Sequence, residues 1–113
     1  MARLDRQPGF VIEESGIRLI TDLRRGGPPK LLENLSEAVK HTDGESVSID
    51  LASINRLDSL GASFLAELVV RGHVAGKEVH FTGISEGVQK GLARYYYPAP
   101  DVRIPVQKAY RLE

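Results

Sequence analysis

The stretch SVSIDLASINRLDSLGA, residues 46–62, predicts a buried strand, a short loop and the start of a helix. Apolar and polar residues alternate over its first six positions, which is the period of two expected for a strand with one packed face. The apolar positions are Val47, Ile49 and Leu51. A helix is expected to begin near Gly61, with Leu57 packing into the core before it. The stretch therefore presents one hydroxyl group, that of Ser59, at the expected start of the helix.

Asp58 and Ser59 stand at the expected N-cap of this helix. A short side-chain oxygen at that position accepts a hydrogen bond from an otherwise unpaired backbone N–H group. A helix N-terminus also favours negative charge and can hold a phosphate. The two residues are therefore either caps, worth about 1 kcal/mol each, or part of a functional site. Residue type alone leaves both interpretations open.

The pattern Asp-Leu-Ala, a spacer, Leu-Asp-Ser-Leu-Gly-Ala and an apolar helix resembles STAS domains, the family of sulfate transporters and anti-sigma factor antagonists. Residues 76–83 and 84–88 also resemble the strand and the last helix start of that family. The resemblance covers residues 9–95. It implies an α/β, STAS-like fold in which helices pack against a small mixed β-sheet with a β-hairpin at the N-terminus.

The resemblance also gives Asp58 and Ser59 a candidate regulatory role. In the anti-sigma factor antagonists, the hydroxyl residue directly after the Asp is phosphorylated, and Ser59 occupies that position. Leu60 is a departure, because those antagonists usually carry a small residue there.

The rest of the chain predicts alternating strands and helices. A hairpin is expected over residues 10–21, turning at Ser15-Gly16, and a helix is expected after the Gly-Pro turn at residues 26–29. The buried stripe of that helix should comprise Leu31, Leu32, Leu35, Ala38 and Val39. A strand around Val79 and a helix from Ser85 to Arg94 complete an α/β arrangement with right-handed crossovers.

Length and composition suit one small domain. The chain has 113 residues, of which 42% are hydrophobic, and it contains no cysteine. We expect a flexible N-terminus at residues 1–8, the STAS domain at 9–97, an extended segment or linker at 98–111, and a possible affinity-tag remnant at 112–113. Fifteen basic and fifteen acidic residues give zero formal charge, which argues against a nucleic-acid partner.

The helix after Ser59 carries more apolar residues than one buried stripe requires. Leu65 and Leu68 should face the sheet, but the apolar surface extends further around the helix. That surface is either covered within the domain or available to a partner. The predicted partner-binding residues are Leu60, Gly61, Ala62, Ser63, Ala66 and Val70.

Enzyme signatures in the chain lack the groups that their chemistry needs. The segment from Gly72 to Glu78 resembles a phosphate loop, but its glycines are too close together and Glu78 replaces the metal-binding hydroxyl. The three histidines have no carboxylate or cysteine at ligand spacing, and Ser59 lacks a nucleophile elbow. We therefore predict a non-catalytic chain with no cofactor and no metal.

Two functional classes follow from the resemblance. The first is a regulatory domain fused to or associated with the permease of an Mla-type lipid ABC transporter. Such a domain would bind the transporter ATPase through the helix after Asp58-Ser59, in the cytoplasm at the inner face of the inner membrane. The second is a free-standing anti-sigma factor antagonist, which would bind a kinase and be switched by phosphorylation of Ser59.

Overall fold

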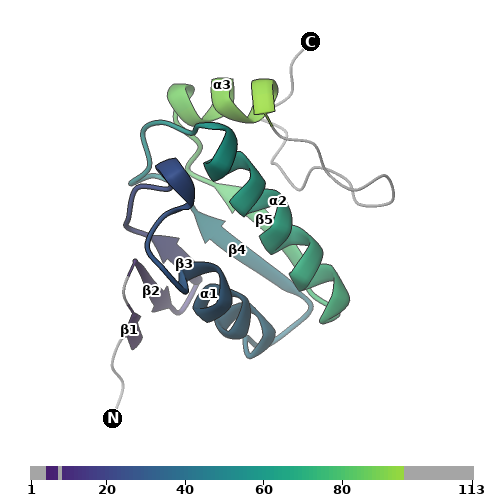
Figure 1. The fold of residues 1–113 in the computed structure, drawn as a ribbon. Coiled ribbons are helices and arrows are strands. Elements are labelled where there is room, and N and C mark those ends of the chain that lie inside the picture. Colours follow the sequence, from purple (N-terminus) through teal and green to yellow (C-terminus); the bar gives the residue numbers. More distant parts are fainter. Residues whose placement is uncertain (1–4, 8, 96–113) are drawn as a thin grey trace.

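The computed structural model describes residues 5–7 and 9–95, which form one five-stranded mixed sheet covered by helices (Figure 1). In chain order, the elements are β1 (Asp5–Gln7), β2 (Phe10–Glu13), β3 (Gly16–Leu19), η1 (Arg24–Gly26), α1 (Leu31–Lys40), β4 (Ser46–Asp50), α2 (Ser59–Val74), β5 (Glu78–Thr82) and α3 (Glu86–Tyr95). The strands lie in the sheet in the order in which they occur in the chain.

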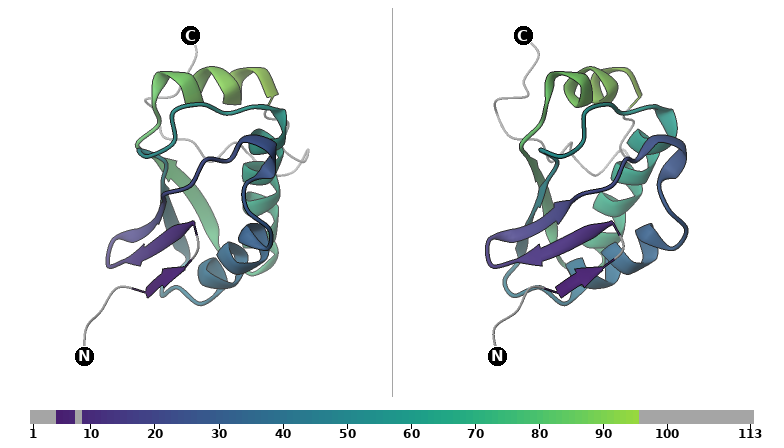
Figure 2. Two further views of the ribbon diagram at one scale, coloured as in Figure 1. Left: turned by 60° about the vertical axis from the view of Figure 1, so that its left-hand side comes forward. Right: turned by 90° about the vertical axis from the view of Figure 1, so that its left-hand side faces the viewer.

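The sheet changes from antiparallel to parallel pairing at β3. Strands β1, β2 and β3 pair antiparallel, whereas β3, β4 and β5 pair parallel. Helix α1 lies in the connection from β3 to β4, and α2 lies in the connection from β4 to β5. Both helices cover the same face of the sheet, and α3 crosses the end where β4 and β5 finish (Figure 2). The α/β fold with an N-terminal hairpin, predicted from the sequence, is confirmed.

The core lies between that face and the helices. A row of paired residues, Ile17, Ile49 and Phe81, crosses three strands, and each side chain is buried. The polar residues that alternate with them lie on the opposite face, which the two helices leave uncovered (Figure 2). The helix residues buried over the sheet include Leu31, Leu35 and Val39 of α1 and Leu65, Leu68 and Val69 of α2. The period-two and period-3.6 patterns therefore identified the packed faces correctly.

Gly16 starts β3 at a place where no side chain fits. Its φ is 148°, and a Cβ built there would lie 2.4 Å from the carbonyl oxygen of Ser48 on the adjacent strand. The hairpin turn predicted at Ser15-Gly16 is therefore followed directly by a close contact between β3 and β4, which glycine permits.

Several boundaries differ from those predicted. Helix α2 begins at Ser59 rather than near Gly61. The N-terminus is not wholly irregular, because Asp5–Gln7 pairs with β2 as strand β1. The predicted segments 98–111 and 112–113 lie outside the described residues. Within the described part of the chain, no helix has both the length and the apolar character needed to cross a membrane.

Candidate functional site

Asp58 is the N-cap of α2. Its backbone is extended, with φ −95° and ψ −174°, and its Oδ1 accepts a hydrogen bond from the backbone N–H of Gly61 at 2.8 Å. Its carbonyl oxygen accepts the first helical hydrogen bond, from Ala62 N at 2.9 Å. The capping role predicted for Asp58 is therefore confirmed. Ser59, which was also expected at the cap, is instead the first residue of the helix.

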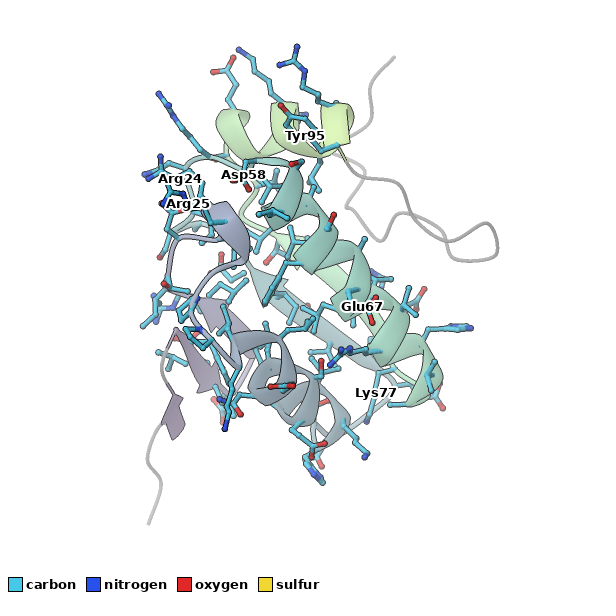
Figure 3. The ribbon with its side chains drawn as sticks, viewed as in Figure 1. Arg24, Arg25, Asp58, Glu67, Lys77 and Tyr95 are labelled. Carbon is cyan, nitrogen blue, oxygen red and sulfur yellow. The ribbon has the colours of Figure 1, made fainter. Side chains whose placement is uncertain are left out.

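The second carboxylate oxygen of Asp58 holds a distant segment against the helix start. Asp58 Oδ2 accepts a hydrogen bond from the backbone N–H of Arg25 at 3.0 Å, across 33 positions of sequence. Arg25 has a left-handed backbone conformation with φ 61°, which is uncommon for a residue with a side chain. Figure 3 shows Arg24, Arg25 and Asp58 together at this corner of the molecule. Asp58 therefore joins η1 to α2.

These contacts lower the pKa of the Asp58 carboxyl. Burial is the largest influence and by itself raises the pKa, but hydrogen bonds from the backbone N–H groups of Gly61 and Arg25 outweigh it and hold the pKa below its usual value. Backbone N–H donors favour the ionised carboxylate, because the protonated form accepts their hydrogen bonds less well. The cap is therefore at full strength with Asp58 ionised.

Replacing Asp58 with alanine should cost about 1 to 2 kcal/mol of unfolding free energy at neutral pH. Because the folded-state pKa is lowered, the contribution of the carboxylate is present above the ordinary carboxyl pKa of about 3.9 and is lost as pH falls through the folded-state value. Urea unfolding of both proteins at neutral and acidic pH measures this, and the difference between them should shrink in acid. Asp58→Asn is the control, because asparagine caps a helix without titrating. A difference that stays constant in acid would contradict this role of the charge.

The loop before Asp58 is fixed at its start and in its middle. Leu51 N donates to Thr82 O at 2.8 Å, which ties the loop to β5. Further along, Ile54 O accepts a hydrogen bond from the hydroxyl of Ser85, just before α3, at 3.1 Å. The Asp58 cap is thus positioned by the sheet on one side and by α3 on the other.

Gly61 lets η1 approach the first turn of α2. A Cβ at this position would lie 2.8 Å from Leu57 Cδ1 and 3.0 Å from the carbonyl oxygen of Leu23. Leu23 directly precedes η1, so the glycine permits the approach that the hydrogen bond between Asp58 and Arg25 stabilises. The fold therefore explains the Asp-Ser-x-Gly spacing, because the aspartate caps α2 and the glycine leaves room for η1, whatever further role the motif has in function.

Ser59 and Leu60 are exposed on the outer side of this first turn. Leu60 is 55% exposed, which is high for a large apolar side chain. Within the described residues, no hydrogen bond of the Ser59 hydroxyl is found. The hydroxyl and the leucine therefore lie side by side in sequence on an accessible surface.

The predicted partner-binding residues divide into exposed and buried ones. Ser63 is exposed, and Ala66 and Val70 are half-buried. Ala62 has no exposed surface and Gly61 is buried, so the expectation that they face a partner is wrong. The elements η1, α1 and α3 all pack against α2. They therefore bury a larger part of its surface than the one stripe that faces the sheet. The role of the other residues stays a prediction.

The structure adds two features that the sequence analysis did not identify. Val74, the last residue of α2, is 82% exposed and continues the outer side of the helix beyond Val70. A groove also runs between α1 and α2, and Leu60 and Phe64 line it together with Lys30 and Leu32. Extending the helical period one turn further would have found Val74, whereas the groove depends on how the helices pack.

The candidate phosphate-loop and metal residues serve other contacts. Lys77, in the turn after α2, donates from Nζ to the carbonyl oxygen of Thr42 at 2.7 Å. His41 Nε2 lies 3.2 Å from Glu37 Oε1, and His80 Nε2 lies 3.4 Å from Glu78 Oε1. Within residues 5–7 and 9–95, no group of three or more His, Cys, Asp or Glu side chains could hold a metal ion.

Comparison with known families assigns the domain. The family model described as Mlab, STAS domain, matches residues 9–96, which is most of the chain. The protein therefore belongs to the STAS domain family, whose members are generally non-catalytic regulatory and interaction domains. A search of curated proteins found no match to the chain.

Proposed function

We propose that this chain is a regulatory STAS domain that binds the cytoplasmic ATPase of an Mla-type lipid ABC transporter. The observation that carries the proposal is the exposed Leu60 at the start of α2, beside the exposed Ser59. We call the outer side of α2 the docking surface, defined as Ser59, Leu60, Ser63, Val70 and Val74. In this proposal a fused or associated permease holds the domain at the cytoplasmic face of the inner membrane.

The docking surface combines hydroxyl and apolar residues with one ion pair on the same side of α2. Its members are hydroxyl or apolar residues, and Leu60 and Val74 are large apolar side chains that water contacts directly. Glu67, four residues after Ser63 and three before Val70, is exposed on this side of the helix and pairs with Arg71 at 3.1 Å. Apolar residues with few charges are typical of the centre of a protein interface. The surface therefore suits a lasting contact with another protein.

The matched family supports this partner class. The description of the family model names Mlab together with the STAS domain, and the match includes all of α2. An interaction domain of this kind needs an accessible surface on a rigid element, and α2 is held by the sheet, by the Asp58 cap and by its neighbouring helices. The transporter ATPase is the partner that the proposal assigns to that surface.

The double variant Leu60→Asp with Val74→Asp should abolish capture of the ATPase by the tagged chain. Both side chains are exposed, so the variant should keep the melting temperature and circular dichroism spectrum, whereas two desolvated charges would oppose the contact. A pull-down with the purified transporter ATPase measures the effect. The control is Ile20→Asp, which changes an exposed apolar residue directly after β3 and should leave capture unchanged. Capture by a folded double variant, or equal loss in the control, would overturn the proposal.

The alternative function, a free-standing anti-sigma factor antagonist, is favoured by one observation. The Ser59 hydroxyl is exposed at the first position of α2, where a kinase could reach it. A phosphate there would add a charge of about −1.5 to −2 to the docking surface. The same pull-down with an anti-sigma factor kinase in place of the ATPase separates the two functions.

A further inference from the structure

Two arginines near the start of α2 have no acidic partner among the described residues. Arg25 in η1 and Arg56 in the loop before Asp58 are both exposed. Within residues 5–7 and 9–95, neither guanidinium forms a salt bridge. We call this pair the arginine corner. It differs from the other end of the docking surface, where Arg71 is paired with Glu67.

The two nearby carboxylates, Asp22 and Asp58, keep their negative charge, but both oxygens of each already accept hydrogen bonds, and neither forms a salt bridge with Arg25 or Arg56. Asp22 Oδ1 accepts from Arg24 N at 2.9 Å, and its Oδ2 accepts from Arg24 Nε at 2.7 Å. Asp58 gives one oxygen to Gly61 N and the other to Arg25 N. These contacts leave the two remaining guanidinium groups available to a ligand.

The arginines border two depressions of the surface that share Asp22 and Arg24. Arg25 and Asp58 line one depression, and Arg56 lines the other. Ser53, Ile54 and Asn55 line the second depression as well, so polar groups adjoin the guanidinium there. The N-terminus of α2 adds partial positive charge at the same place. The two guanidinium groups therefore border adjoining depressions, which are lined by three arginines and two aspartates.

We infer that the arginine corner binds an acidic segment of the protein that docks on α2. Guanidinium groups bind carboxylates through paired, charge-assisted hydrogen bonds, and an acidic protein segment supplies several carboxylates at adjacent positions. The chain has zero formal net charge, so its positive surface is local and too small for the many phosphate contacts of a nucleic acid. The inference rests on the proposed function, because the corner adjoins Leu60 and Ser59 of the docking surface.

The first test uses the chain alone. Pentaglutamate peptide is titrated into the isotopically labelled protein at low salt, and NMR follows the arginine Nε–H groups and the backbone amides. We expect saturable shifts at Arg25, Arg56 and Ser59 that high salt removes. The variant Arg25→Gln with Arg56→Gln should bind about tenfold more weakly or not at all. The control, Lys40→Gln with Lys90→Gln, removes the same charge from exposed sites elsewhere and should bind like the unmodified protein.

The outcomes separate this inference from the proposed function. Shifts spread over all basic side chains, equal binding by the arginine variant, or binding to anionic phospholipid vesicles without binding to the peptide would each overturn the inference. In the ATPase pull-down, the arginine variant should be captured about tenfold less well than the lysine control. If it is captured normally while Leu60→Asp with Val74→Asp is not, the inference fails and the proposed function stands. If both variants are captured normally, both fail.

Discussion

Replacing Ile49 with alanine should lower the free energy of unfolding by about 2 to 5 kcal/mol. Ile49 has no exposed surface and lies between Ile17 and Phe81 in the cross-strand row beneath the helices. Removing three carbons there loses hydrophobic burial and leaves a cavity that the neighbouring strands cannot fill without moving. Urea unfolding followed by circular dichroism measures the loss.

Ser48→Ala is the matched control for this change. Ser48 belongs to the same strand and faces the side of the sheet that the helices do not cover, where it is half-buried. Its replacement should alter stability by no more than about 0.5 kcal/mol. A similarly small loss for Ile49→Ala would contradict the placement of the core between the sheet and the helices.

The burial of Ile49 can be predicted from the sequence for a simple physical reason. A strand with one packed face must alternate apolar and polar residues, and a helix over a sheet must repeat apolar residues at three and four positions. Val47 and Ile49 follow the first rule, and Leu31, Leu35 and Val39 follow the second. These periods arise from burial itself, so they predict which faces are covered before any contact is known.

The same sequence periods do not predict burial correctly where several elements pack against different sides of one helix. The helical wheel places Ala62 away from the Leu65 stripe, yet Ala62 is fully buried because neighbouring elements also pack near the start of α2. Strand β1 and η1 are three residues each, which is too short to show a period. Local patterns therefore predict reliably which side of a helix or strand faces the main core, but they predict poorly which other side a further element covers.

In the candidate site, too, the features set by neighbouring residues could be predicted from the sequence, whereas the contacts between distant residues could not. The Asp58 cap follows from a residue type beside an apolar helix, and the family resemblance identified the same position. The contact between Asp58 and Arg25 joins residues 33 positions apart, and the left-handed backbone at Arg25 has no signature in its own neighbours. The arginine corner therefore could not be predicted from the sequence, because it forms only when η1 packs against the start of α2.

Gly91→Ala should lower the unfolding free energy by about 1 to 3 kcal/mol, although alanine is the better helix former. Gly91 is buried in α3, where a Cβ would lie 2.5 Å from the carbonyl oxygen of Leu57 and 2.6 Å from its Cβ. Both contacts are closer than atoms can approach, and the backbone oxygen has no freedom to rotate away. Relieving them requires α3 or the loop before Asp58 to move. Chemical unfolding measures the loss of stability.

The control for Gly91→Ala is the opposite change at an exposed position of the same helix. Ala93 is exposed, so Ala93→Gly should cost about 1 kcal/mol through helix propensity alone. If propensity governed both sites, Gly91→Ala would stabilise the protein by a similar amount, and that result would contradict the close contact with Leu57. Because Leu57 directly precedes Asp58, displacement at Gly91 should also disturb the cap, so amide exchange at Gly61 and Ala62 should accelerate in Gly91→Ala but not in Ala93→Gly.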